Sequence, residues 1–413
     1  MSAIAAGYKL TEAGVIPEAW EVMSLGDIAS VTAGGTPSRT NAAYWNGDIP
    51  WVTTSEVDFC TVDHAEQFIT RDGLKNSAAK LLPCGTLLMA LYGQGKTRGK
   101  IAILGIEAAT NQACAAISLR SEASREFVFY SLVSQYDRIR SLSNTGNQEN
   151  LNGSLIRSIS VLLPSPPEQR AIAAALSDVD ALLGGLDRLI AKKRDLKQAA
   201  MQQLLTGQTR LPGFEGVWQA KRLAQVGTFL KGTGVKKDEA QTGGLACVRY
   251  GEIYTHHNDY IKSFNSWISA GVAATATRLK QGDLLFAGSG ETKEEIGKCV
   301  AFIDNCEAYA GGDTVILRTA EVDPKFMGYY CNTAPINAQK ASKGQGDAIV
   351  HISAAALSSV VVSLPTTEEQ SAIAAVLSDM DTELSTLEAR HTKTRALKQA
   401  MMQALLTGRI RLV

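Results

Sequence analysis

The sequence predicts an α+β fold: two homologous α/β domains separated by a pair of long antiparallel coiled-coil helices, related by a pseudo-twofold axis. Three observations predict it. Residues 163–211 align without a gap on residues 364–412, with about 28 of 49 positions identical. Within each copy, apolar residues recur at alternating spacings of four and three, which is typical of a coiled-coil seam. The segments that precede the two copies match each other weakly but in the same order.

The first body, residues 1–163, contains short apolar segments bounded by glycine or proline, a pattern that predicts strands. These strands are expected within 47–57, 85–93, 100–105 and 112–119, followed by an amphipathic helix over 125–142. No strand–helix alternation of the Rossmann type occurs. The loops between the strands are rich in glycine and polar side chains.

The first repeated helix is expected over 164–208. Ser165 and Glu168 have the spacing of a capping box, in which the hydroxyl accepts a backbone N–H and the carboxylate reaches back to the N–H of the capping residue. Pro166 suits the first helical position. Gly207 suits the left-handed residue that ends a helix. Both ends of the helix are therefore encoded in the sequence.

The second body, residues 209–363, repeats this organisation. Strands are expected within 245–254, 282–290, 297–303 and 313–318, and a helix within 324–339. The second repeated helix, 364–413, has its own capping box in Thr366 and Glu369 and its own terminal glycine, Gly408. The bodies have diverged while the helices have not, so the helices are expected to share one task and the bodies to differ in theirs.

Each helix of about 40 residues would be about 60 Å long, and neither buries its apolar residues alone. The simplest partner of each is the other copy; the alternative is that each is an ordinary core helix of its own domain. The predicted seam and partner-binding residues are Ile172, Leu176, Val179, Leu183, Leu186, Leu196, Leu204, Ile373, Leu377, Met380, Leu384, Leu387, Leu397 and Leu405. Gly184 and Gly185 suggest close helix contact or a slight bend. The identical LKQA segments at 196–199 and 397–400 suggest docking of two copies of an outside protein.

The composition excludes several functions. The 41 basic residues balance 41 acidic ones, so the chain lacks the charge that drives DNA binding unaided, and a partner would supply much of the phosphate attraction. No apolar segment approaches the roughly 20 residues of a membrane span, and the start lacks a secretory signal, so we expect a cytoplasmic protein. The seven cysteines form no CxxC pair and are expected to be reduced and buried. No histidine shows metal-ligand spacing.

Two near-motifs leave an enzymatic alternative, a nuclease or NTPase. Residues 90–97, ALYGQGKT, miss the phosphate-binding loop at their first position, and the segment that follows has the pattern of a strand, not of the required helix. Asp283, Glu291 and Lys293 resemble a nuclease triad, but the first half has Thr86 and Gln94 at the first two of these positions. We therefore expect no catalysis by this chain. A structural coiled-coil scaffold that binds protein partners is the other alternative.

The segments LPSPPEQRAIAAALSD and LPTTEEQSAIAAVLSD, the LKQA…LLTG helix ends and the Trp-x4-Leu-x2-Ile/Val start of each body resemble the specificity subunits of Type I restriction-modification systems. The resemblance covers essentially the whole chain. It implies two target recognition domains, each reading one half of a bipartite, asymmetric sequence in double-stranded DNA. It also implies that the helices set the spacing and dock two modification subunits.

The resemblance further implies that this chain binds no cofactor. In that family the modification subunits hold S-adenosylmethionine and methylate adenine, and restriction subunits, where present, use ATP and Mg²⁺ to cleave DNA. A rigid spacer predicts half-sites about one helical turn apart, roughly 34 Å. Four residues inserted near Gly184 are expected to lengthen the tolerated gap and leave both half-sites unchanged.

The loops that follow the predicted strands supply the candidate DNA contacts, because Arg, Lys, Gln, Asn and Thr are side chains that recognise base edges. In the first body these candidates are Thr36, Ser38, Thr54, Gln94, Lys96 and Arg98. In the second body they are Lys236, Lys237, Arg249, Tyr250, Glu252 and Lys293.

Overall fold

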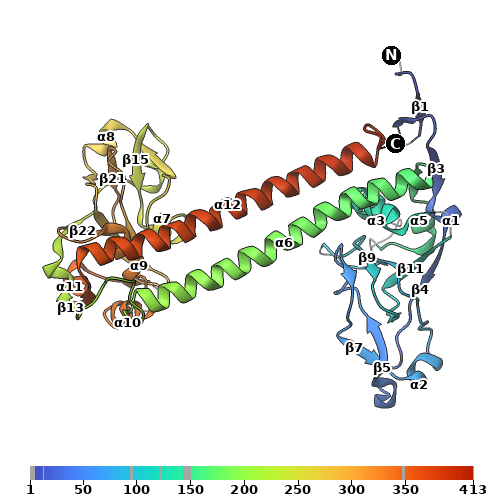
Figure 1. Ribbon diagram of the computed structural model, residues 1–413, viewed down its shortest axis with the longest axis horizontal. Coiled ribbons are helices and arrows are strands. Elements are labelled where there is room, and N and C mark those ends of the chain that lie inside the picture. Colours follow the sequence, from blue (N-terminus) through green and yellow to red (C-terminus); the bar gives the residue numbers. More distant parts are fainter. Residues whose placement is uncertain are drawn as a thin grey trace. The chain divides into compact units, whose positions relative to one another are not determined.

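The computed structural model describes residues 5–12, 14–93, 96–120, 123–142, 150–346 and 349–412. It divides into two compact units. The first combines residues 1–187 with 389–413, and the second is 188–388. Each unit thus holds one body, the start of one long helix and the end of the other (Figure 1). Within the described ranges, no helix has both the length and the apolar character that crossing a membrane requires.

The first body is built on two sheets. The larger has the strand order β4-β11-β8-β9-β6, made by Ala29–Ala33, Cys114–Leu119, Leu87–Ala90, Ile101–Leu104 and Thr61–Val62. The smaller has the order β10-β5-β7, made by Ala109–Thr110, Trp45–Val52 and Gln67–Ile69. Two antiparallel pairs complete the strands: β1 (Tyr8–Thr11) with β2 (Gly14–Pro17), and β3 (Glu21–Ser24) with β12 (Ser160–Leu163).

Short helices connect these strands. They are α1 (Leu25–Ile28), η1 (Ala42–Tyr44), α2 (Arg71–Lys75), α3 (Arg125–Ser134), α4 (Tyr136–Ser141) and α5 (Gly153–Arg157). The single helix predicted over 125–142 is therefore wrong in one respect, because the chain interrupts it at Gln135. The Gln135 side chain donates to the Ser160 carbonyl at 3.1 Å. This contact ties the break between α3 and α4 to strand β12.

The second body repeats the topology. Its sheets have the orders β14-β22-β18-β20 and β16-β15-β21-β17. The strands are β14 (Gly227–Lys231), β22 (Thr314–Thr319), β18 (Asp283–Ala287), β20 (Cys299–Ala301), β16 (Ser266–Ile268), β15 (Leu245–Val248), β21 (Ala308–Ala310) and β17 (Thr277–Arg278). The pairs β13 (Gln219–Arg222) with β24 (Val361–Leu364) and β19 (Ser289–Gly290) with β23 (Val350–His351) complete them. The first body adds β6 to its larger sheet and the second adds β17 to its smaller one, but the order of the other strands is shared, which confirms two bodies of one fold.

The helices of the second body follow the same plan. They are η2 (Leu223–Gln225), η3 (Lys237–Glu239), α7 (Tyr250–Thr255), α8 (Ala270–Ala273), α9 (Pro324–Tyr330), α10 (Ala334–Ala341) and α11 (Ala354–Ser358). The strand predicted within 245–254 is correct only for its first half, because the chain turns into α7 at Tyr250. The helix predicted within 324–339 is present as two helices, α9 and α10.

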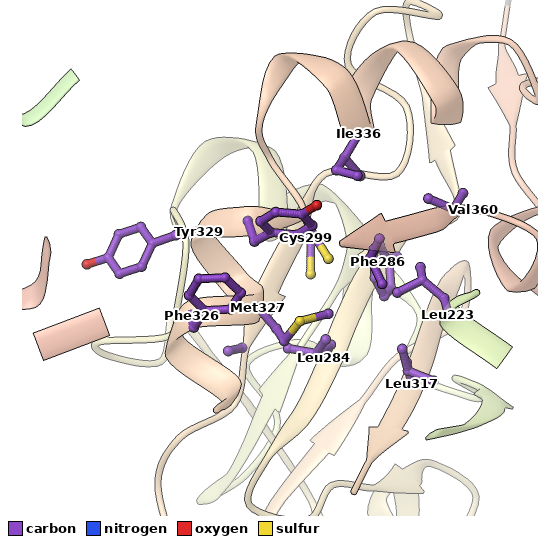
Figure 2. Packing of buried hydrophobic residues seen from close by; sticks show 14 of the residues in the cluster. Leu223, Leu284, Phe286, Cys299, Leu317, Phe326, Met327, Tyr329, Ile336 and Val360 are labelled. Carbon is purple, nitrogen blue, oxygen red and sulfur yellow. The ribbon is translucent and has the colours of Figure 1, made fainter. Parts of the chain in front are cut away.

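The core of the second body lies between its larger sheet and helix α9. Figure 2 shows Leu284 of β18 close to Met327 of α9, and Phe286, Cys299 and Phe326 belong to the same buried cluster. The Tyr329 ring is fully buried but its hydroxyl points away from this cluster (Figure 2). This shared core packs helix α9 against the larger sheet.

The long helices are α6 (Pro166–Leu204) and α12 (Thr367–Leu405). In the second unit, Lys193 pairs with Glu383 at 2.7 Å and Arg194 with Glu388 at 2.5 Å. In the first unit, Lys398 pairs with Asp180 at 2.5 Å and His391 with Asp187 at 3.1 Å. In the first unit the position rises from Asp180 to Asp187 on α6 while the partner falls from Lys398 to His391 on α12. In the second unit it rises from Lys193 to Lys197, whose partner is Asp381, while the partner falls from Glu383 to Asp381. The predicted antiparallel pairing is therefore confirmed within each unit.

The apolar seam is present but is shorter than predicted. Leu186 and Leu384 are buried along the helices. Ile172 and Leu176 instead join the hydrophobic core of the first body, so both readings of the helices hold in part: their starts are core helices and their middles pair. Other predicted seam residues that join body cores are Leu204, Ile373, Leu377 and Leu405, with Met380 packed against one of them. Val179, Leu183 and Leu387 are half-buried.

Leu196 and Leu397 do not belong to the seam. Their side chains are 47% and 54% exposed, because the four-residue steps at the ends of the helices carry these leucines around to the outer face. The suggestion of close helix contact at Gly185 is also wrong, since a Cβ atom there would meet no atom within 4 Å. The helix continues through this glycine without interruption.

The helix ends are confirmed in part. Gly207 and Gly408 have positive φ values of 70° and 72°, as expected for terminal left-handed residues. The Thr366 hydroxyl accepts the N–H of Glu369 at 3.4 Å. The carboxylate half of the predicted capping boxes is wrong, because Glu168 and Glu369 are buried and bind arginines that follow the end of the other helix.

The cysteines are all free, as predicted. Cys60, Cys84 and Cys306 are exposed, however, so burial holds only for the other four.

Candidate nucleic-acid interface

The loops of the first body that carry candidate contacts are tied together by backbone hydrogen bonds. The N–H of Gly35 donates to the Thr110 carbonyl at 2.8 Å, and that of Asn111 donates to Val52 at 3.1 Å. The N–H of Leu91 donates to the Ala113 carbonyl at 2.8 Å. Loops 34–39, 53–56, 91–93 and 111–113 therefore meet beside the smaller sheet, although they are far apart in the sequence.

Most of the predicted residues lie at or near the surface of this loop cluster. Thr36 is half-buried and its hydroxyl donates to the Gln112 side chain. Ser38 is exposed and lies 2.9 Å from the Thr40 hydroxyl. Thr54 is half-buried and Lys96 is exposed. Gln94 lies outside the described residues.

The structure contradicts the prediction that Arg98 contacts DNA. Its side chain is only 6% exposed and donates from Nη2 to the Arg140 carbonyl at 2.9 Å. The guanidinium thus joins the loop to helix α4 inside the domain. A side chain in this position does not face solvent, so we remove Arg98 from the candidate DNA contacts.

The second body gathers the corresponding loops. The N–H of Gly311 donates to the Val248 carbonyl at 2.9 Å, and that of Gly312 donates to Gly234 at 3.0 Å. The N–H of Gly288 donates to Asp313 at 2.7 Å. Lys236, Lys237, Tyr250 and Lys293, which lie on or next to these loops, are exposed.

The structure also contradicts the prediction that Glu252 contacts DNA. It is 3% exposed, accepts the Arg249 N–H at 3.2 Å and binds the Ser266 hydroxyl. The Arg249 guanidinium lies 3.4 Å from the same carboxylate. Glu252 therefore joins the start of α7 to strand β16 and is not available to a base, while Arg249 is half-buried beside it.

The first member of the supposed nuclease triad, Asp283, is not a free carboxylate. Asp283 is fully buried and accepts two hydrogen bonds from Arg318, at 2.9 and 2.8 Å. These bonds raise the pKa of Arg318. Residues 101–104, which follow the near P-loop, form strand β9 as predicted. No group of three or more His, Cys, Asp or Glu side chains suited to a metal ion occurs in the part of the chain that the structure describes.

Each body is attached to the long helices by a tyrosine, an aspartate and a lysine, and these three side chains recur in both units. In the first, Tyr130 of α3 donates to Asp180 at 2.8 Å, and Lys398 pairs with that aspartate. In the second, Tyr329 of α9 donates to Asp381 at 2.6 Å, and Lys197 pairs with it. Burial together with the bond to aspartate raises the pKa of both tyrosines.

A glutamine at the start of each long helix adds a second tie. Gln169 accepts the N–H of Ser124, just before α3, at 2.8 Å. Gln370 accepts the N–H of Asp323, just before α9, at 3.0 Å. The glutamine of the repeated EQ pair therefore orients the body relative to the helix that follows it.

The glutamate of the same pair binds an arginine and a tryptophan in the first unit. Glu168 accepts from Arg411 Nη2 at 2.7 Å and from the Trp20 indole at 3.1 Å. In the second unit Arg210 binds Glu369 at 2.5 Å. Contacts within the units thus account for the EQ pair that the two repeats share.

The LKQA segments serve two purposes. Lys197 and Lys398 pair with Asp381 and Asp180 within the units, so these two lysines are not available to an outside protein. Leu196 and Leu397 are exposed, and so are Gln198 and Gln399. One identical exposed surface, which we call the LKQA surface (Leu196–Gln198 and Leu397–Gln399), therefore occurs on each helix.

Fold and site together define a class: a duplicated protein with two loop-bearing α/β bodies, each attached to paired helices by matching tyrosine–aspartate–lysine and glutamine contacts. A family model described as "Type I restriction modification DNA specificity domain" matches residues 17–191 and again residues 215–397. The chain belongs to this family, the specificity subunits of Type I restriction-modification systems.

Individual relatives agree. The Type I restriction enzyme MjaIX specificity subunit of Methanocaldococcus jannaschii is 31% identical over 183 residues, or 43% of this chain and 41% of that protein. This chain thus matches less than half of that relative's length. The MjaVIII specificity subunit of the same organism is 21% identical over 423 residues, covering 96% of this chain and 94% of that protein.

Solved structures show the same fold. The S subunit of a Type I restriction-modification system from M. genitalium matches with a TM-score of 0.59 at 15% identity, covering 96% of this chain and 97% of that one. The HsdS subunit from Thermoanaerobacter tengcongensis matches with a TM-score of 0.52 at 18% identity, covering 96% and 98%.

Proposed function

We propose that this chain is the DNA-reading component of a Type I restriction-modification complex, and that each body recognises one half of a bipartite, asymmetric site in double-stranded DNA. The observation that carries the proposal is the contrast between the two bodies. Four strands of the larger sheet and three of the smaller follow the same order in both bodies, and the tyrosine and glutamine contacts to the long helices match, whereas the clustered loops differ in sequence. A shared frame with two different loop sets is suited to recognising two different half-sites.

We further propose that the helices dock two modification subunits. Two identical exposed LKQA surfaces support this, because two equal sites accept two copies of one partner. Leu196 and Leu397 are apolar side chains that would gain from burial against it. The neutral net charge of the chain also supports partners that supply phosphate contacts.

Catalysis is assigned to those partners. We propose that the modification subunits bind S-adenosylmethionine and methylate adenine, that restriction subunits use ATP and Mg²⁺, and that the complex is cytoplasmic. The burial of Asp283 and its pairing with Arg318 support a chain without nuclease chemistry of its own. Hydrolysis of DNA or ATP by the purified chain with Mg²⁺ would contradict this assignment.

Mapping methylated adenines in the host genome tests DNA recognition directly. The expected result is one split motif with two unlike halves and a fixed gap. Deletion of this gene should abolish methylation at that motif. Methylation that persists at the same motif in the deletion strain would reject the proposal.

Docking is tested by stoichiometry. Leu196→Asp and Leu397→Asp should each remove one modification subunit from the complex in native mass spectrometry, and the double variant should remove both. Lys192→Glu, an exposed change on α6, is the matched control. Two subunits retained by the double variant would place the docking surface elsewhere.

A further inference from the structure

Arg39 ends the loop 34–39 of the first body and was not among the contacts predicted from the sequence. Its side chain is exposed, and its Cζ lies 3.7 Å from the Trp45 ring centroid and 5.0 Å from that of Trp51. The two indoles contact each other edge to face, with centroids 5.1 Å apart. Stacking on an aromatic face holds the planar guanidinium in one orientation.

The backbone beneath Arg39 is anchored by the same two tryptophans. The Trp45 indole donates to the Ser38 carbonyl at 3.1 Å, and the Trp51 indole donates to the Gly35 carbonyl at 2.9 Å. Trp51 is only 2% exposed, so it fixes the loop to the core of the smaller sheet. Both ends of the loop are therefore held, and little freedom remains to be lost when Arg39 binds a ligand.

The charge of Arg39 is not neutralised within the domain. Among the residues that the structure describes, no carboxylate forms an ion pair with it. Arg125 of the same body pairs with Glu126 at 2.5 Å, and Arg318 of the second body pairs with Asp283. Arg39 thus differs from these arginines: its face is covered by indole, and its N–H groups donate no hydrogen bond to any residue that the structure describes.

We propose that Arg39 recognises a guanine in the half-site of the first body, donating two N–H groups to O6 and N7. This inference rests on the proposed function. Guanine is the base that presents two acceptors at this spacing in the major groove, and the arginine fork matches them. A phosphate contact would need only a positive charge, whereas stacking fixes a plane, which a base edge requires.

Arg39→Lys and Arg39→Ala in the full chain, expressed in the host with its complex, test the assignment by mapping methylated adenines. Both variants should relax a guanine requirement at one position of one half-site. Discrimination there should fall by about 5- to 150-fold, the range for one bidentate arginine contact. Arg39→Lys should fail like alanine, because lysine keeps the charge but lacks the planar fork.

Two results would overturn the proposal. One is an unchanged motif in both variants. The other is a uniform loss of methylation at all sites with Arg39→Ala that Arg39→Lys restores, since this indicates a phosphate contact. Arg125→Lys is the matched control, an exposed arginine of the same body already bound to Glu126, and should retain the wild-type motif.

The other half-site is an internal control in every variant. It should remain fully specified, which shows that the chain is folded and assembled. A wild-type host without any split motif would reject the proposed function itself. A split motif that lacks guanine in both halves would reject only the assignment of Arg39.

Discussion

The Nζ atom of Lys197 lies 2.6 Å from Oδ1 of Asp381, and the other oxygen of this carboxylate accepts the Tyr329 hydroxyl at 2.6 Å. One aspartate of α12 thus binds α6 and body helix α9 at once. Burial opposes its ionisation, but the bonds from Lys197 and Tyr329 outweigh burial and lower the pKa of Asp381. Asp180 makes the same contacts in the first unit.

The two aspartates differ in exposure, and we expect their substitution to differ in cost. The side chain of Asp381 is 12% exposed and that of Asp180 is 39% exposed. Asp381→Asn should destabilise its unit by about 1–3 kcal/mol, because a charged acceptor of two hydrogen bonds is lost. Asp180→Asn should cost less than about 1 kcal/mol, because solvent screens the pair. Urea denaturation measures both, and equal losses would contradict this explanation.

In the first unit, Glu168 is expected to contribute more to the free energy of unfolding than Asp180 does. It is fully buried and accepts bonds from Arg411 and Trp20. Glu168→Gln keeps an acceptor for the indole but loses the ion pair, which should cost about 1.5–3 kcal/mol in urea denaturation. In that background Arg411→Gln should add little, since the pair is already broken. Full additivity of the two changes would contradict the coupling, and exposed Glu18→Gln is the control.

Two glycines of the long helices should respond in opposite directions to alanine. Gly185 is helical and has open space for a Cβ atom, so Gly185→Ala should stabilise the helix by about 0.5–1 kcal/mol. Gly408 has a φ of +72°, and a Cβ there would lie 2.5 Å from Cδ of Pro17. Gly408→Ala should cost about 1–2 kcal/mol from the left-handed backbone alone. Thermal unfolding checks both signs, and a neutral Gly408→Ala would contradict the helix end described above.

The stability of the second unit is expected to fall in mild acid. Burial lowers the pKa of His257 to about 4, with smaller effects from Glu252, His256 and Lys298. The unfolded chain, with a histidine pKa of about 6.5, binds the proton first as the pH falls. The contribution of neutral His257 is therefore complete above about pH 6.5 and is lost towards pH 4.

Calorimetry at pH 7 and pH 5 measures this effect. His257→Gln should show a smaller drop in Tm between the two pH values than the wild type. His64→Gln, an exposed histidine of the first body, should retain the wild-type drop. An identical drop in wild type and His257→Gln would assign the acid sensitivity to other groups.

The long helices were predictable because their signals are local: an apolar period, a hydroxyl residue before the first turn and a glycine after the last. The contacts of Glu168 and Glu369 were not predictable, because the arginines that bind them are distant in the sequence. The same reason applies to Glu252. Its position three residues after Arg249 does not reveal that its carboxylate is buried, because the burial depends on Ser266 of β16, which is distant in the sequence.

The candidate site divides in the same way. Exposed lysines such as Lys236 and Lys293 follow from loop composition alone. The burial of Arg98 depends on where α4 lies, and the sequence pattern does not contain that position. Arg39 was missed because its orientation comes from indoles contributed by the following strand.

The seating of each body has an evolutionary consequence. It uses a tyrosine and a backbone N–H at one short helix, α3 or α9, together with an aspartate, a lysine and a glutamine on the long helices. None of these groups belongs to the clustered loops. Mutation or recombination can therefore replace an entire loop set with another. The contacts that attach the body to the long helices then remain, and no compensating change is required.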